Sequence, residues 1–275
     1  MRRPGDLDGP YAERSVDAGP TSAPAPYECC RVRIDGMTPA GAVARLLSAV
    51  REKASLSVHL CNAFTLALAQ RDSDFAALLN AGDINLPDGV PVAWFGRWVT
   101  GGRVAGPVPG PSLMRGVFAR DTSRSVRHFL LGSSTDVLTL MQTSIRAEFP
   151  GTQIVGAFSP PVTDDVGLLA ELASDAIRTS RAELVWVGLG TPKQDWVSAA
   201  LAEQLRVVAV PVGAAFDFLA GTTREAPAWL RGTGLEWLFR LVTEPRRLWR
   251  RYLVGNPVFI AGAIKSAWLL RRRLR

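Results

Sequence analysis

Short runs of Val, Leu and Ile alternate with helical stretches along most of this chain. The runs expected to be strands are Leu56–Leu60, the residues ending at Leu86, Val126–Leu131, Gln153–Phe158, Leu184–Leu189 and Val207–Val212. Continuous apolar runs separated by helices are typical of a parallel sheet that is covered on both faces. The sequence therefore predicts an α/β fold, a doubly wound, mainly parallel Rossmann-like sheet. Such a fold places a binding site at the carboxyl ends of its strands.

The chain divides into three parts by composition. Residues 1–26 are rich in Pro, Gly, Ala and acidic residues without periodicity, and we expect a disordered leader. Residues 27–228 are expected to form the α/β core. Residues 229–275 contain short helical pieces rich in Trp and Arg, which predict a basic helical C-terminal appendage.

No stretch of the chain reads as a membrane span or a signal peptide. The first residues lack an apolar core. The most apolar stretch, Leu253 to Leu270, is interrupted by Asn256–Pro257 and Lys265, so we expect no spanning helix. The three cysteines, Cys29, Cys30 and Cys61, have no metal-binding spacing and are expected to be reduced thiols, which fits a cytoplasmic protein.

Charge is concentrated in the appendage. The chain has a net charge of +7, and the segment from Arg240 to Arg275 has ten basic residues and one acid, Glu244. The appendage thus favours an anionic partner. Its Trp and Tyr residues alternate with arginine clusters, which favours peripheral attachment to an anionic membrane surface. A solvated basic helix and an RNA-binding tail are the alternatives, and the sequence contains no recognisable nucleic-acid module.

The segment from Gly188 to Gln194 lies between an expected strand and an expected helix. Thr191 suits the N-cap and Pro192 the first helical position. Free N–H groups at such a helix start favour a phosphate or diphosphate, with Lys193 adding charge and Gln194 adding hydrogen bonds. The alternative is an ordinary capped helix. Gly132-Ser133-Ser134, in a similar position, is expected to be a tight turn.

Four aspartates are candidates for chemistry. Asp88 follows an expected strand, where it serves either as a turn former or as a general base toward a hydroxyl nucleophile. Asp217 lies between two Phe residues and either binds a ligand or satisfies a backbone turn. Asp72 and Asp74 have the Asp-x-Asp spacing of many sugar-nucleotide enzymes, but their place at a helix start favours a cap. With only His59 and His128 in the chain, we expect no bound metal.

The order of these motifs resembles the WecG/TagA/CpsF glycosyltransferase family over roughly residues 32–259. The similarity rests on Asn62, Leu86-Pro87-Asp88-Gly89, Arg103-Val104-x-Gly106, Leu113-Met114, Leu130-Leu131-Gly132, Phe149-Pro150, Gly188-x-Gly190-Thr191-Pro192-Lys193-Gln194, Gly213-Ala214-x-Phe216-Asp217, Gly221, Ala226-Pro227, Gly234-Leu235-Glu236-Trp237, Arg240-Leu241, and Glu244-Pro245-Arg246-Arg247 through Arg251-Tyr252.

The resemblance implies transfer of a hexosamine-type sugar, N-acetylmannosamine or a relative, from a UDP-sugar. The implied acceptor is a sugar on polyprenyl diphosphate at the inner face of the cell membrane, in the synthesis of a surface polysaccharide or wall polymer. It implies inversion, no metal and no cofactor, with Asp88 as the catalytic base. The implied substrate-binding residues are Asn62, Arg103, Thr191, Lys193, Gln194 and Asp217, with Arg240, Arg246, Arg247, Arg250 and Arg251 from an appendage that closes over the site.

Three residues depart from the family pattern. Leu60 stands where many members have a Thr, Glu225 reverses a usual positive charge, and Asp195 replaces a usual Glu. The segment between Asp88 and Arg103 is also shorter than in many members. These departures leave the donor sugar open. Two other functions remain as alternatives: a non-catalytic membrane adaptor of the same fold, and a nucleic-acid-binding protein that uses the basic appendage.

Overall fold

The structure is a computed structural model that describes residues 25–121, 123–227, 229–230 and 232–273. The leader expected over residues 1–26 lies almost entirely outside these residues. The elements in chain order are β1 (Tyr27–Cys29), β2 (Val32–Ile34), α1 (Pro39–Arg51), β3 (Leu56–Cys61), α2 (Ala63–Arg71), α3 (Ser73–Ala81), β4 (Ile84–Pro87), α4 (Val90–Val99), α5 (Gly110–Arg120), β5 (Arg127–Gly132), α6 (Thr135–Glu148), β6 (Gln153–Phe158), α7 (Val166–Ser180), β7 (Leu184–Gly188), α8 (Lys193–Leu205), β8 (Val208–Pro211), α9 (Ala215–Leu219), α10 (Glu236–Thr243) and α11 (Pro245–Arg273).

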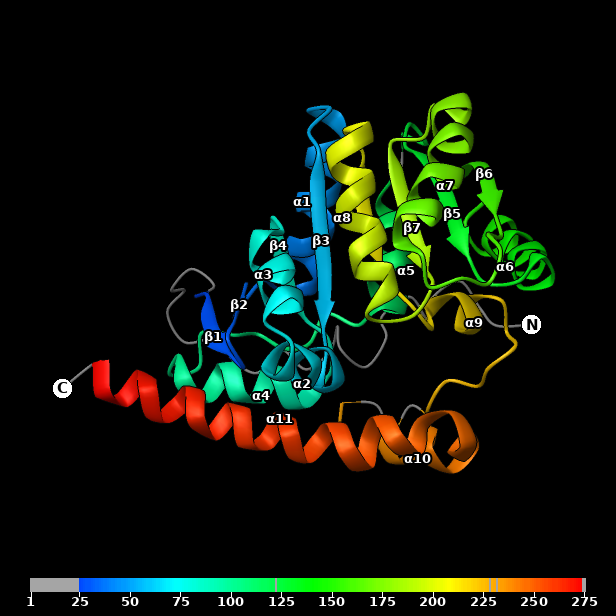
Figure 1. The fold of residues 1–275 in the computed structure, drawn as a ribbon. Coiled ribbons are helices and arrows are strands. Elements are labelled where there is room, and N and C mark those ends of the chain that lie inside the picture. Colours follow the sequence, from blue (N-terminus) through cyan, green and yellow to red (C-terminus); the bar gives the residue numbers. More distant parts are fainter. Residues whose placement is uncertain (1–24, 122, 228, 231, 274–275) are drawn as a thin grey trace.

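A six-stranded sheet with the order β4-β3-β8-β7-β5-β6 forms the centre of the molecule. Every pairing within it is parallel. Helices α7 and α8 pack on one face, and α1, α5 and α6 lie on the other (Figure 1). The predicted fold class, a doubly wound parallel sheet with a helical C-terminal appendage, is therefore confirmed.

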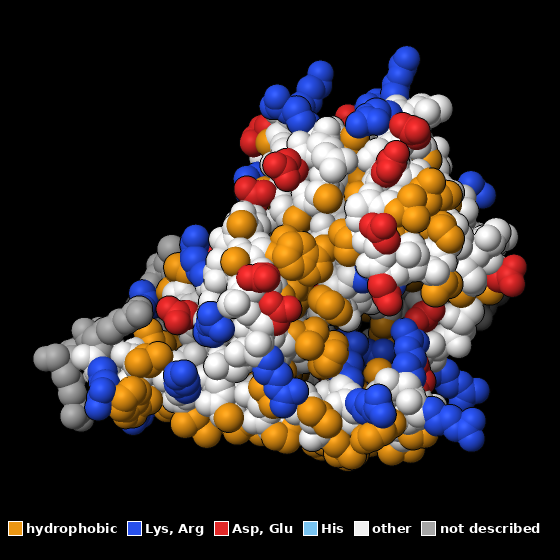
Figure 2. All heavy atoms as spheres, in the orientation of Figure 1, with side chains coloured by type: hydrophobic (Ala, Val, Ile, Leu, Met, Phe, Trp, Pro, Cys, Tyr) orange, Lys and Arg blue, Asp and Glu red, His pale blue; other side chains and the backbone are white. Residues whose placement is uncertain are grey.

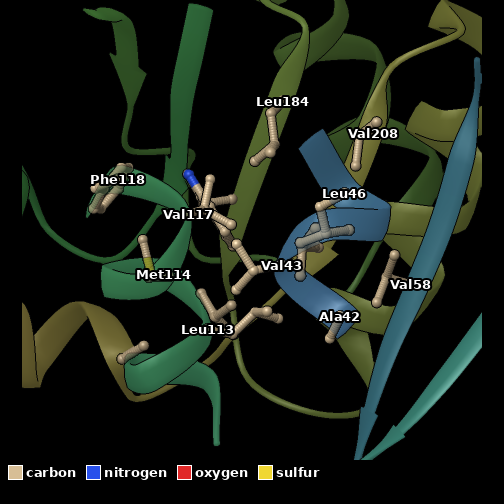
Figure 3. Packing of buried hydrophobic residues seen from close by; sticks show 14 of the residues in the cluster. Ala42, Val43, Leu46, Val58, Leu113, Met114, Val117, Phe118, Leu184 and Val208 are labelled. Carbon is tan, nitrogen blue, oxygen red and sulfur yellow. The ribbon is translucent and has the colours of Figure 1, made fainter. Parts of the chain in front are cut away.

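The main core lies between the sheet and α1, α5 and α6. Figure 3 shows Val43 and Leu46 of α1 and Leu113 of α5 converging on Leu184 of β7 and Val208 of β8. All five are almost fully buried. Since the opposite face of the same strands packs on α7 and α8, the strands need apolar residues at every position, which explains their unbroken Val and Leu runs.

The appendage differs from its prediction, because short helical pieces were expected and α11 continues for 29 residues through Pro257. A proline inside a helix costs roughly 3 kcal/mol, so tertiary packing has to offset it. That packing is close: a side chain at Gly255 would begin 3.2 Å from the Phe64 ring of α2, and one at Gly262 would begin 2.6 Å from Cys30 Sγ. Ser266 Oγ also accepts the Cys30 N–H at 3.0 Å.

The length of α11 also overturns the expectation that no helix is apolar enough to span a bilayer. Judged by length and composition alone, one helix among the described residues, Pro245–Arg272, meets that requirement, and a third of its most apolar window is buried against the rest of the protein. Asn256–Pro257 and Lys265 therefore do not interrupt the helix, which continues through all three residues.

Candidate active site

The sheet order brings the carboxyl ends of β4, β3, β8 and β7 next to one another. Asp88 follows β4, Asn62 follows β3, and Gly213 and the Gly190–Gln194 loop follow β8 and β7. The candidates from separate parts of the sequence therefore meet at one edge of the sheet. Helices α10 and α11 run below this edge, and Figure 2 shows a hollow between them and the core with Lys and Arg side chains along its lower side.

Asn62 orients Asp88. The Asn62 Oδ1 atom caps α2 by accepting the N–H groups of Phe64 and Thr65, each at 3.1 Å. The cap fixes the amide so that Nδ2 faces Asp88 and donates to its Oδ2 at 3.2 Å. The Asp88 backbone is held as well, since its N–H donates to the Cys61 carbonyl at 3.0 Å. In the described part of the chain no donor is bonded to Asp88 Oδ1, which leaves this oxygen for a substrate.

Burial raises the pKa of the Asp88 carboxyl above its ordinary value, and Glu236 acts in the same direction. The hydrogen bond from Asn62 and the charges of Arg251 and Arg240 oppose this rise. A carboxylate with a raised pKa is a stronger proton acceptor than an exposed one. Asp88 is thus both positioned and electrostatically suited to accept a proton.

Two appendage arginines reach the same site. The Arg251 guanidinium lies 4.8 Å from the centre of the Phe64 ring, and that of Arg240 lies 5.3 Å from the Phe218 ring. The Nε atoms of both are buried and have no hydrogen-bond partner among the described residues. Burial lowers the pKa of Arg251. Arg240 also lies 4.0 Å from Glu244 Oε1. Partly buried cations with unused Nε donors suit an anionic ligand such as a diphosphate.

The remaining appendage arginines have other surroundings. Arg247 contacts Asp217 Oδ2 at 3.5 Å and Glu244 at 3.0 Å, so Asp217 helps to hold the appendage. Arg246 and Arg250 are exposed, and Arg250 stacks on Trp249. Arg103 is also exposed and donates to the Thr100 carbonyl, and no interaction of the described residues joins it to Asp88.

The loop between β7 and α8 corrects one expectation. Thr191 was predicted to cap α8 with Pro192 as its first residue, but α8 begins at Lys193 and Pro192 occupies the cap position without a side-chain bond. The buried Gln194 side chain folds back instead: its Oε1 accepts the Gly190 N–H at 3.1 Å and its Nε2 donates to Thr191 Oγ1 at 3.2 Å. Gln194 therefore shapes this loop from within.

Lys193 also differs from expectation. It was predicted to add positive charge at the start of α8, but its ammonium group pairs with Asp164 at 2.7 Å and with the Thr163 carbonyl. Part of its charge is therefore already compensated in the loop before α7.

The acidic pair Asp72 and Asp74 serves as the sequence suggested. Asp72 caps α3 by accepting the N–H groups of Asp74 and Phe75 at 2.9 and 3.0 Å. Within the described ranges no group of three or more His, Cys, Asp and Glu side chains is arranged to hold a metal ion.

A buried polar pair that was not predicted lies beneath the site. His59 Nδ1 lies 3.1 Å from Asp195 Oδ1, and His59 Nε2 lies 3.3 Å from Ser57 Oγ. The pair joins β3 to the first turn of α8, directly beside Gln194. Two polar residues in the otherwise apolar strand Leu-Ser-Val-His-Leu were the available signal, because such residues need buried partners.

Residues 27–273 match the sequence model of the glycosyl transferase WecG/TagA/CpsF family. A protein of Bacillus subtilis (strain 168) named N-acetylglucosaminyldiphosphoundecaprenol N-acetyl-beta-D-mannosaminyltransferase is 28% identical over 186 residues, 67% of this chain and 70% of that protein. A protein of the same name from Bacillus spizizenii is 29% identical over 198 residues, 72% of this chain and 74% of that protein.

Proposed function

This chain belongs to the WecG/TagA/CpsF family and is a glycosyltransferase, and from that premise we propose its reaction. It transfers an N-acetylmannosaminyl or closely related hexosaminyl group from a UDP-sugar to N-acetylglucosamine on polyprenyl diphosphate. The names of the two relatives support the acceptor and the transferred sugar. The observation that carries the proposal is that the charges of Arg240 and Arg251 act on Asp88, while the buried Nε atoms of both arginines have no hydrogen-bond partner among the described residues.

Asp88 is the general base in this proposal. Its free Oδ1 takes the proton from the acceptor hydroxyl while Asn62 holds Oδ2. The hydroxyl oxygen forms a bond to the anomeric carbon of the donor as the bond from that carbon to the UDP oxygen breaks. UDP departs with the bonding electrons. This single displacement inverts the anomeric centre.

Arg251 and Arg240 stabilise the departing diphosphate. Both are cations with buried donors, so they match the charge that grows on the leaving group. This arrangement performs the task that a divalent metal performs in other sugar-nucleotide enzymes, and we therefore propose a metal-independent reaction. Since both arginines come from the appendage, turnover requires the appendage to remain docked.

The departures from the family pattern have structural partners. Glu225 pairs with Arg115 of α5 at 2.8 Å, so its reversed charge is compensated within the core. Leu60 is buried at the end of β3, against Gly110. A Thr hydroxyl is thus replaced by an apolar contact, which bears on the choice of donor sugar rather than on the proton transfer at Asp88.

We place the protein on the inner face of the cell membrane as a peripheral protein. The exposed face of α11 carries Trp249, Leu253, Ile260, Ile264 and Trp268, and its opposite face packs on α2 and β1. Apolar side chains gather along the lower edge of the molecule (Figure 2). Because the arginine-bearing end of α11 is part of the site, a helix lying in the interface fits better than one that leaves the core to span the bilayer.

The test is UDP release from a panel of UDP-sugars with a short-chain polyprenyl-diphosphate-linked N-acetylglucosamine, with and without EDTA. We expect release with UDP-N-acetylmannosamine or a relative, dependent on acceptor and resistant to EDTA. Asp88→Asn should reduce turnover by at least a hundredfold with UDP affinity nearly unchanged. The matched control is Asp74→Asn. Asp74 is an exposed carboxylate on α3 and one member of the Asp-x-Asp pair, and this variant should retain full activity.

Other outcomes identify the alternatives. Near wild-type turnover by Asp88→Asn would reject Asp88 as the base, and loss of release in EDTA would reject metal independence. If the protein neither binds UDP nor releases it from any donor, the result would favour the non-catalytic adaptor. Salt-sensitive RNA binding without vesicle binding would favour the nucleic-acid reading.

A further inference from the structure

Helix α4 presents two indoles to solvent although it belongs to the α/β core. Trp94 and Trp98 are 57% and 59% exposed and, four residues apart, share one face of the helix. The opposite face is tightly packed, because a side chain at Gly96 would begin 2.5 Å from the Tyr27 ring of β1. The orientation of α4 is therefore fixed, and its two largest apolar side chains point outward.

The appendage contacts both indoles through residues near its two ends. A side chain at Gly234, just before α10, would begin 3.2 Å from the Trp94 ring. At the other end, the Arg271 guanidinium of α11 lies 5.4 Å from the centre of the Trp98 ring. Figure 1 shows α4 lying beside α11 in the lowest layer of the molecule. The outer face of α4 is thus continuous with the exposed apolar face of the appendage.

The sequence of α4 and of the segment that follows it is cationic. No acidic residue occurs in the sequence between Asp88 and Asp121, whereas Arg97 and Arg103 are exposed on and just after α4. Indoles beside arginines are the side chains that prefer the headgroup layer of an anionic bilayer. A second copy of the chain is a poorer occupant, because it would bring two sets of arginines against each other.

We propose that the outer face of α4, through Trp94 and Trp98, is a second contact with an anionic phospholipid bilayer, made by the catalytic core itself. This inference rests on the membrane attachment proposed above and adds a surface outside the appendage. Its consequence concerns the reaction, because Asp88 precedes the first residue of α4 by two positions. At about 1.5 Å per residue, Trp94 lies only about 6 Å along the helix from Val90. Docking α4 therefore holds the catalytic carboxylate close to the headgroups, where a lipid-linked sugar diphosphate is found.

The experiment measures binding of the full chain to vesicles of phosphatidylglycerol and phosphatidylcholine by co-sedimentation. The Trp94→Gln, Trp98→Gln double variant should bind about tenfold more weakly than the wild type, because two large apolar side chains lose their burial in the interface. The matched control is Leu140→Gln, Leu172→Gln, two leucines on α6 and α7 that are 48% and 40% exposed, and it should bind like the wild type. All three proteins should turn over a water-soluble short-chain acceptor at the same rate.

A direct probe of α4 keeps the proposal testable even if the double variant folds poorly. The three native cysteines are buried, so a polarity-sensitive fluorophore can be attached selectively to Arg97→Cys on the outer face of α4, with Thr143→Cys on α6 as the control position. Vesicles should shift the emission of the first probe to the blue and leave the second unchanged. Wild-type binding to vesicles with no shift at position 97 and no effect of the double variant would overturn the α4 contact while leaving appendage attachment intact.

Two further results would also reject the α4 contact. A shift at position 97 that depends on protein concentration without vesicles would identify self-association instead. No vesicle binding by the wild type would reject both this contact and the membrane attachment on which it rests. Acceptor-dependent UDP release in the soluble assay would still support the proposed reaction in that case.

Discussion

A buried histidine provides a prediction about stability whose size can be worked out from the structure. His128 on β5 is fully buried, and its Nδ1 accepts the indole N–H of Trp186 at 3.3 Å. Burial lowers the pKa of His128 from 6.5 to about 4, against a smaller opposing effect of Asp121. In the unfolded chain the same imidazole takes up its proton near pH 6.5.

The sign follows from proton binding. Between about pH 6.5 and 4 the unfolded state binds a proton at His128 that the folded state does not, so stability falls as the pH falls through this window. Above pH 6.5 both states are neutral and the effect is absent. At about 1.4 kcal/mol per pH unit, lowering the pH from 7.5 to 4.5 should remove about 2.5 kcal/mol of unfolding free energy through this one residue.

The perturbation is His128→Asn, because the Asn side-chain oxygen can accept the Trp186 N–H in place of Nδ1 and does not titrate. Urea unfolding of both proteins at pH 7.5 and pH 4.5 gives the two differences. The wild type should lose about 2.5 kcal/mol more than the variant over this interval. Equal losses in the two proteins would refute the assignment of acid sensitivity to His128.

Two more predictions concern the site. Arg251→Met removes a charge that lowers the pKa of Asp88, so the acid limb of the pH profile of kcat/KM should move to higher pH and kcat/KM should fall by at least about tenfold. The control is Lys265→Met, which removes an exposed cation from the same helix. An unshifted acid limb in Arg251→Met would contradict the role of Arg251. Asp195→Ala leaves His59 buried without its partner, so urea unfolding should show a loss of about 2 kcal/mol, and wild-type stability would show that the pair is not needed.

The sequence predicted the sheet well because each strand is a local signal. A run such as Leu184–Leu189 is apolar on both faces, and only a strand covered on both sides buries all of it. The continuation of α11 through Pro257 could not be predicted from local sequence. Pro257 is a local signal against a helix. The contacts that outweigh it, at Gly255 and Gly262, come from α2 and from the turn after β1, which are distant in the sequence.

The predictions for the site also succeeded where the signal was local and failed where it depended on distant contacts. Asp88 could be placed from local sequence, because it lies in an Asp-Gly turn at the end of β4. Its hydrogen bond with Asn62 could not, because that bond spans 26 residues and depends on β3 and β4 being neighbours. The sequence likewise did not predict which appendage arginines face the core. Arg250 and Arg251 are adjacent in a basic cluster, yet Arg250 stacks on the exposed Trp249 and Arg251 stacks on the partly buried Phe64 ring of α2. The rotation of α11 about its own axis, relative to α2, determines which of the two arginines faces the core.

The docking of α11 therefore governs the chemistry at a distance. The close contacts at Gly255 and Gly262 fix the rotation of the helix on α2 and β1, and that rotation places Arg251 over Phe64, beside the Asn62 cap that orients Asp88. The same rotation turns Trp249, Leu253 and Ile260 outward. One packing arrangement thus sets both the cationic side of the site and the apolar face of the appendage. A surface that binds the exposed face of α11 would stabilise the same rotation, so attachment to lipid through α11 is compatible with an intact site.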